Sequence, residues 1–74
     1  MEDLIHIHKT FDKVILIEKK INNREFDGCI FKNCDFSHSD FSYNTFIDCE
    51  FINCNLSMTQ LIKTSLKTVQ FTNC

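Results

Sequence analysis

The chain has 74 residues, of which 43% are hydrophobic and 24% are charged, and its formal net charge is −2. This length allows one domain, the hydrophobic content argues against intrinsic disorder, and the lack of a basic excess disfavours direct binding to nucleic acid. No secretory signal pattern opens the chain, and its longest apolar run, Val14 to Ile17, is too short to span a membrane. We therefore expect a cytoplasmic protein with no membrane partner.

The first expected element, residues 1–23, follows a five-residue pattern imperfectly. Large apolar residues recur every five positions, beginning at Phe11, but Lys9 and Lys19 stand two residues before such positions. Side chains two apart on an extended segment face the same way, and a buried charge without a partner is strongly unfavourable. We interpret this segment as a degenerate N-terminal coil or a capping strand, and we expect its β-structure at Val14–Ile17.

The second element, residues 24–74, repeats a large apolar residue at every fifth position without interruption. A period of five fits neither a helix nor a straight strand. It fits a solenoid in which every five residues contain a corner that restores the phase. The inward-facing large residues are then Phe26, Phe31, Phe36, Phe41, Phe46, Phe51, Leu56, Leu61, Leu66 and Phe71.

A second set of residues, two positions before each large one, is expected to face inward as well. Nearly all of them are small, and alternation of large and small side chains suits the close packing of a narrow interior. Asn44 is the exception, and we expect its amide to hydrogen-bond the backbone. The set includes every cysteine, which we interpret as small apolar filler: Cys29, Cys34, Cys49, Cys54 and Cys74.

A longer repeat of twenty residues relates the segments FKNCDFS at 31–37, FINCNLS at 51–57 and FTNC at 71–74. Four five-residue sides per coil place these segments above one another, whereas three sides would lose the register. Neighbours in each column are then separated by a strand spacing of about 4.8 Å. The third residue of each segment is an asparagine, and we expect these amides to form a corner column that is hydrogen-bonded from coil to coil.

This pattern resembles the pentapeptide repeat family, whose repeats read roughly as small–polar–Leu/Phe–polar–polar, over residues 24–74. The resemblance implies an all-β fold, namely a right-handed parallel β-helix, or square solenoid, with about two and a half coils. The run C-x-F-x-x-C at 29–34, followed by C-N-L-S-M at 54–58, is similar to the quinolone-resistance members of the family.

Those members are dimeric rods that resemble DNA in shape and charge and bind DNA gyrase or topoisomerase IV. They are longer and more acidic than this chain. The resemblance therefore implies a non-catalytic scaffold for protein–protein interaction, which binds and protects one of these topoisomerases as a DNA mimic.

The outer surface carries the candidate partner-binding residues. Between residues 26 and 55 the acids outnumber the bases, because Lys32 is the one cation there. An acidic rod can meet a basic, DNA-binding groove on a partner, and a contiguous apolar patch can mark an interface. We single out four acids and three isoleucines as candidate contacts: Asp35, Asp40, Asp48, Glu50, Ile30, Ile47 and Ile52.

Catalytic and metal sites are not expected. The cysteines lack a C-x-x-C pair, the spacing typical of zinc sites, and His6 and His8, which would share one face of a strand, have no clear third ligand. No nucleophile–base pair or phosphate-binding loop is visible, and an interior filled with phenylalanine leaves no cavity for a substrate. We expect neither enzymatic activity nor a cofactor, and a cysteine-based metal or redox site is the chemical alternative.

The last coil is unfinished at Cys74, which should leave backbone donors and acceptors of residues 56–74 unpaired along the axis. Such an edge is a template for pairing, and a second copy related by a two-fold axis would satisfy it. We therefore expect a homodimer or a larger stack through the C-terminal coil. The structural alternative to a scaffold with a specific partner is a fragment or a self-assembling stack of coils without one.

Overall fold

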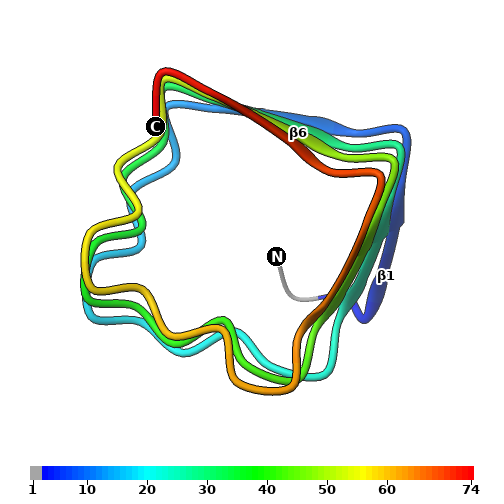
Figure 1. Cartoon of the computed structure of the whole chain (residues 1–74), viewed down its shortest axis with the longest axis horizontal. Coiled ribbons are helices and arrows are strands. Elements are labelled where there is room, and N and C mark those ends of the chain that lie inside the picture. The colour runs from blue at the N-terminus through cyan, green and yellow to red at the C-terminus, as the bar shows by residue number, and fades with distance from the viewer. Residues whose placement is uncertain (1–2) are drawn as a thin grey trace.

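The computed structural model describes residues 3–74, which wind into a four-sided solenoid (Figure 1). In Figure 1 the chain turns anticlockwise as it approaches the viewer, so the coils are right-handed. No segment of the described residues forms a helix long and apolar enough to cross a membrane. The strands of residues 3–74 are β1 (Ile5–Ile7), β2 (Thr10–Asp12), β3 (Glu25–Asp27), β4 (Ile30–Lys32), β5 (Thr45–Ile47), β6 (Glu50–Ile52), β7 (Ser65–Lys67) and β8 (Gln70–Thr72).

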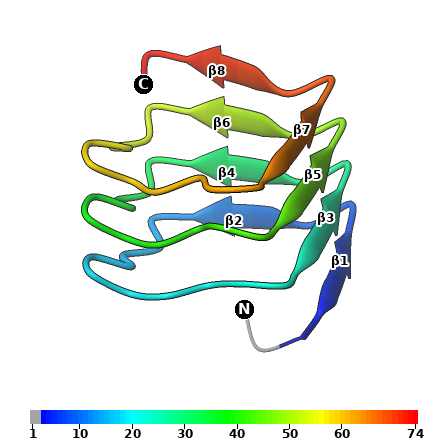
Figure 2. The same ribbon diagram turned by 60° about the horizontal axis from the view of Figure 1, so that its bottom comes forward.

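The strands form two parallel sheets on adjacent sides of the solenoid (Figure 2). β1, β3, β5 and β7 make one sheet, and β2, β4, β6 and β8 make the other. Each strand pairs with the strand twenty residues later, so Phe26 lies beside Phe46 and Phe31 beside Phe51. The other two sides carry turns and isolated bridges. The twenty-residue repeat is therefore one coil of four sides, and the all-β parallel β-helix predicted from the sequence is confirmed.

A corner follows every side, and each corner residue has a positive φ. From His8 to Asn73 these residues recur every five positions with φ between 51° and 66°. The left-handed conformation turns the chain and restores the phase of the next side, so one large residue can face inward on each side. Asparagine tolerates this conformation. Asn33 and Asn53 stand in one corner column, where Asn53 Nδ2 donates to Asn33 Oδ1 over 3.5 Å.

The core consists of stacked phenylalanine columns in the middle coils. Phe26 stacks on Phe46 with ring centroids 4.9 Å apart, and Phe31 stacks on Phe51 at 4.7 Å. Such ring pairs add about 0.5–1.5 kcal/mol beyond the burial of apolar area. The buried large residues are Phe26, Phe31, Phe36, Phe41, Phe46 and Phe51.

The small inward side chains donate hydrogen bonds to the preceding coil. Cys49 Sγ donates to the Phe26 carbonyl oxygen over 3.3 Å. Asn44 donates through Nδ2 to the Ile21 carbonyl oxygen over 2.7 Å and accepts from the Arg24 backbone amide over 2.9 Å. Within residues 3–74 every buried side-chain nitrogen and oxygen has a hydrogen-bond partner. In the middle coils the small inward side chains therefore also carry a polar hydrogen, whereas Val14 and Val69 fill such positions in the first and last coils.

Residues 5–23 form a coil of their own beneath residues 24–74, which supply the expected two and a half coils or so. β1 and β2 pair in parallel with β3 and β4. The expected β-structure at Val14–Ile17 is wrong, because this run lies on a side that carries a turn and only Ile15 bridges to the next coil, at Asp35. Residues 1 and 2 of the expected first element lie outside the described residues.

The charged residues at inward positions are tolerated because they lie on the end coil of the described solenoid. Lys9 and Lys19 are both exposed, so their ammonium groups reach water and no unpaired charge is buried. His6 occupies the large inward position of this coil and stacks on Phe26 with centroids 4.9 Å apart. A first coil that departs from the repeat pattern can therefore still follow the same path.

Candidate partner-binding surfaces

Two of the candidate acids, Asp35 and Asp40, serve turns on the sides that lack strands. Asp35 Oδ1 accepts a hydrogen bond from the Ser37 backbone amide over 3.0 Å, and Asp40 Oδ1 accepts one from the Ser42 amide over 2.9 Å. The Ser37 amide lowers the pKa of Asp35, and the hydroxyl and amide of Ser42 lower the pKa of Asp40. Asn55 makes the same bond one coil above Asp35, so the turn needs the oxygen rather than the charge.

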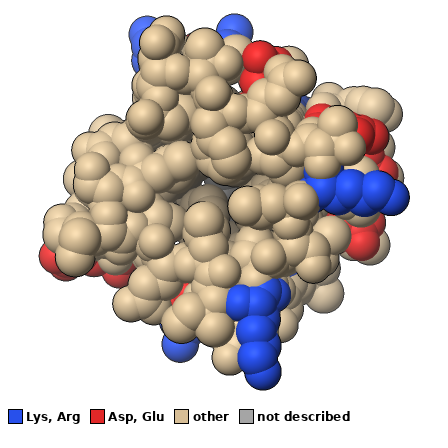
Figure 3. Space-filling view, in the orientation of Figure 1, with Lys and Arg blue, Asp and Glu red and all other residues tan. Residues whose placement is uncertain are grey.

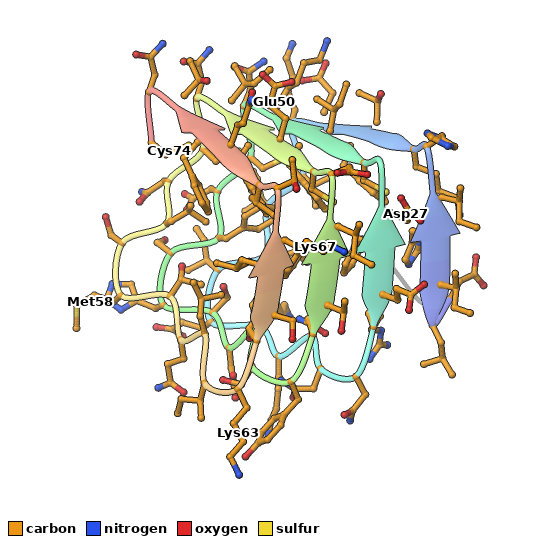
Figure 4. All side chains as sticks on the ribbon, turned by 45° about the vertical axis from the view of Figure 1, so that its right-hand side comes forward. Asp27, Glu50, Met58, Lys63, Lys67 and Cys74 are labelled. Carbon is orange, nitrogen blue, oxygen red and sulfur yellow. The ribbon has the colours of Figure 1, made fainter. Side chains whose placement is uncertain are left out.

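Two other candidate acids and two candidate isoleucines come together at the corner between the sheets. Asp27 lies beside Ile47 in the register of β3 and β5, and Ile30 lies beside Glu50 in the register of β4 and β6. Asp48 is the exposed corner residue between them. Figure 4 shows Asp27 and Glu50 on adjacent sides of the solenoid. We call these five residues, Asp27, Ile30, Ile47, Asp48 and Glu50, the corner patch.

The remaining candidate and two lysines border the corner patch. Ile52 stands at the other end of β6 from Glu50 and pairs with Lys32, and Lys67 on β7 lies beside Ile47. Asp27 was not among the selected candidates. The twenty-residue period, which pairs it with Ile47, is the sequence signal that identifies it. Three of the acids, Asp27, Asp48 and Glu50, thus meet at one corner, while Asp35 and Asp40 lie on the other two sides.

The cysteines lie mainly in the interior, away from positions where they could react. All five are free thiols, and four of them are buried. Burial raises the pKa of Cys34 and of Cys49, and it raises the pKa of Cys54 to about 11. The thiolate that metal binding or nucleophilic attack requires is therefore disfavoured there. Among residues 3–74 no group of three or more His, Cys, Asp or Glu side chains is arranged to hold a metal ion.

The two histidines of the H-I-H segment do not share a face, contrary to expectation. His6 is buried inside the end coil, whereas His8 is an exposed corner residue with a φ of 51°. The alternation of a straight strand stops at this corner, so side chains two apart no longer face the same way. The His8 ring lies over Gly28, where an added Cβ would come within 2.6 Å of His8 Nδ1.

The C-terminal end of the solenoid is open and partly apolar. Leu61, Leu66 and Phe71, all inward-facing in their columns, are 40%, 45% and 47% exposed because they lie on the last coil of the described residues. Figure 3 looks along the axis at this end and shows charged side chains toward the rim, with none in the middle of the face. A hollow of about 450 Å³ opens here, lined by Cys54, Asn55, Leu56, Ser57, Phe71 and Cys74.

The N-terminal end differs, because charged groups close it. Lys9 Nζ lies 3.7 Å from Asp3 Oδ2 and 3.3 Å from His6 Nδ1. Lys19 stands at another small inward position of the same coil and is exposed. An apolar surface placed against this end would have to desolvate these charges, which is unfavourable.

Comparison with known proteins agrees with this architecture. Residues 24–74 match a family model described as "Pentapeptide repeat region". The match covers more than two thirds of the chain and coincides with the coils above the first. None of the curated proteins compared with the chain matches it.

Proposed function

Because this chain belongs to the pentapeptide repeat family, we propose that it is a non-catalytic cytoplasmic scaffold whose corner patch binds a protein partner. The observation that carries the proposal is the patch itself, where three carboxylates surround Ile30 and Ile47. Carboxylates steer a basic partner and set the orientation of the complex, while the apolar side chains between them contribute buried area. The partner surface that fits is a basic groove with apolar contacts at its centre.

We propose DNA gyrase or topoisomerase IV as this partner, with the carboxylates of the corner patch standing in for phosphates of bound DNA. The DNA-binding groove of such an enzyme is basic, so an acidic protein corner can compete for it. The similarity of the C-x-F-x-x-C and C-N-L-S-M runs to the quinolone-resistance members supports this choice. Binding through carboxylates should weaken as the salt concentration rises.

The direct test is the affinity for purified gyrase as a function of salt, measured for the wild type and for Asp48→Asn combined with Glu50→Gln. These substitutions keep the shape of the side chains and remove two charges from the corner patch. We expect the double variant to bind several-fold more weakly than the wild type and to show a smaller salt dependence.

A matched control is Asp35→Asn combined with Asp40→Asn, which removes two charges from the other sides and keeps the oxygens that the turns need. We expect this variant to bind like the wild type. Equal weakening by both double variants would mean that net charge alone matters. No weakening by the corner variant would remove the DNA-mimic proposal.

A second candidate function is self-association, which the partly apolar C-terminal end favours. This end exposes apolar side chains around a hollow, whereas the N-terminal end carries charges that disfavour head-to-tail stacking. A two-fold pairing of C-terminal ends satisfies both observations. We therefore propose a homodimer through the C-terminal coil.

Cysteine cross-linking tests this arrangement, because Cys74 is exposed and lines the hollow while the other four cysteines are buried. A short bifunctional maleimide should link two copies through Cys74 in the native protein. The Cys74→Ser variant should give no linked dimer. Linked dimers that persist in Cys74→Ser, or their absence from the wild type, would contradict pairing through this end.

A further inference from the structure

Among the described residues, His6 is the one large inward-facing residue whose side chain is a titratable ring; the others are apolar. The ring is 3% exposed and stacks on Phe26 at 4.9 Å with an interplanar angle of 7°. Phe11 meets it edge-on at 5.6 Å. The geometry is that of the Phe26–Phe46 pair one coil above, so a phenylalanine at position 6 would continue the column.

Both ring nitrogens of His6 already have partners of fixed polarity. Nε2 lies 2.8 Å from the Asp3 carbonyl oxygen, which can only accept, so Nε2 carries the proton and donates. Nδ1 lies 3.3 Å from Lys9 Nζ, an ammonium that can only donate, so Nδ1 accepts. The neutral ring therefore satisfies both contacts. A second proton would have to sit on Nδ1, where it would face the Lys9 ammonium.

The other charged and titratable groups near His6 give such a proton little help. Asp3 pairs with Lys9 at 3.7 Å instead of with the ring. Asp12 on β2 and Glu25 on β3 are exposed on strands whose central phenylalanines contact the ring, so these carboxylates point away from it. Asp27 at the end of β3 is half-buried on the outer face, and the Cys29 thiol donates to the His6 carbonyl oxygen over 3.4 Å.

We propose that the first coil is a pH-sensitive element, in which protonation of His6 releases residues 3–12 while the later coils stay folded. The charged ring loses its acceptor role toward Lys9 and becomes a buried cation between two phenylalanines, next to another cation. Release of β1 and β2 uncovers Phe26 and Phe31, together with the backbone edges of β3 and β4. Acid would thus turn the closed N-terminal end into a second open one.

The direction of the pH dependence follows from burial. Desolvation is the main cause that lowers the pKa of His6 below its ordinary 6.5. The hydrogen bond to Asp3 and the charge of Asp3 oppose this lowering, and the Lys9 charge adds to it. When the pKa of a group is lower in the folded state than in the unfolded state, its full contribution to stability is present at pH values above the unfolded-state pKa. The stabilisation is lost as the pH falls below 6.5 and through the folded-state pKa. Each unit of lowering corresponds to a tenfold change, or about 1.4 kcal/mol, in the opening equilibrium.

The test compares amide hydrogen-exchange protection factors, corrected for intrinsic exchange, between about pH 7.5 and about pH 5. In the wild type we expect protection of β1 and β2 to fall, tenfold for each unit by which the folded state lowers the pKa of His6, while β5 and β6 keep theirs. In His6→Phe the protection of β1 and β2 should stay constant, because the column is then apolar throughout. His8→Gln is the matched control in the same segment, and it should behave like the wild type, because His8 is exposed.

Three outcomes would overturn the proposal. One is an equal loss of protection in the wild type and in His6→Phe. Another is a simultaneous loss in all coils, which would mean global unfolding. The third, which does not depend on any variant folding, comes from following the His6 ring by NMR in the wild type. A folded-state midpoint at or above 6.5 would show that the buried ring accepts the proton without opening.

Discussion

Phe51 and Phe71 stand in the same column, one coil apart, yet Phe51 is 3% exposed and Phe71 is 47% exposed. Cys54 and Cys74 differ in the same way, since one is buried and the other exposed. The residue type and the local backbone are the same in each pair. What differs is whether a later coil covers the residue. In a solenoid, burial is therefore a property of neighbouring coils, and identical repeats acquire different energies at the middle and at the end.

The phenylalanine pair should show the largest difference. Phe51→Ala is expected to destabilise the protein by about 3–5 kcal/mol, because it opens a cavity in a covered column. Phe71→Ala should cost only about 1 kcal/mol, because half of this side chain remains in water. Urea unfolding at sub-micromolar protein concentration measures both free-energy changes.

Ile52→Ser is the control, because this side chain lies on the outer side next to Phe51, and it should have little effect. A cost equal to that of Phe51→Ala would mean that the assignment of inward-facing and outward-facing residues is wrong.

The cysteine pair should differ in reactivity. With its pKa raised to about 11 from 9.0, the Cys54 thiol has about a hundredth of the thiolate of an ordinary cysteine at neutral pH, and it is also buried. Labelling with a water-soluble thiol reagent should modify Cys74 at least about a hundredfold faster than Cys54. In urea the two rates should become equal. Rapid native labelling of Cys54 would contradict its interpretation as interior filler.

The third pair is Asn44 and Thr64, which occupy one column and both donate to the Phe41 carbonyl oxygen. Asn44→Ala should cost about 1–3 kcal/mol, because the Arg24 amide and the Ile21 carbonyl also lose a partner in a buried place. Thr64→Ala should cost about 1 kcal/mol or less, because the Phe41 carbonyl oxygen keeps the hydrogen bond from Asn44. Thermal unfolding of both variants provides the comparison. Equal losses would contradict the role given to the extra hydrogen bonds of Asn44 with Arg24 and Ile21.

Much of this architecture could be predicted because its period is visible in the residues themselves. The five-residue period predicts a corner at every fifth residue, as the structure shows from His8 to Asn73. The twenty-residue period pairs Phe31 with Phe51. The first coil was harder to interpret. Lys9 looked incompatible with an inward position because the pattern alone does not say that the coil lies at an end, where an ammonium can reach water.

The outer surface is harder to read from the sequence, because a count of acids does not say on which side each one lies. Asp35 and Asp40 are engaged in turns, and a readable signal for this exists: an Asp or Asn stands two residues before a serine in Asp35-Phe36-Ser37 and again in Asn55-Leu56-Ser57. That spacing is typical of a side chain that accepts from the backbone amide two residues on. Asp48 and Glu50 share a corner with Asp27, an arrangement that the twenty-residue period of the sequence also indicates.

The proposed homodimer places a second copy of the chain against the partly apolar C-terminal end. Sedimentation at micromolar concentration tests it most directly, with Leu66→Lys placing a charge in the apolar end face and Ile15→Lys placing one on the outside of the first coil. We predict that the wild type and Ile15→Lys sediment as dimers and that Leu66→Lys sediments as a folded monomer. A wild-type protein that is monomeric at these concentrations, or a Leu66→Lys variant that still dimerises, would contradict the account.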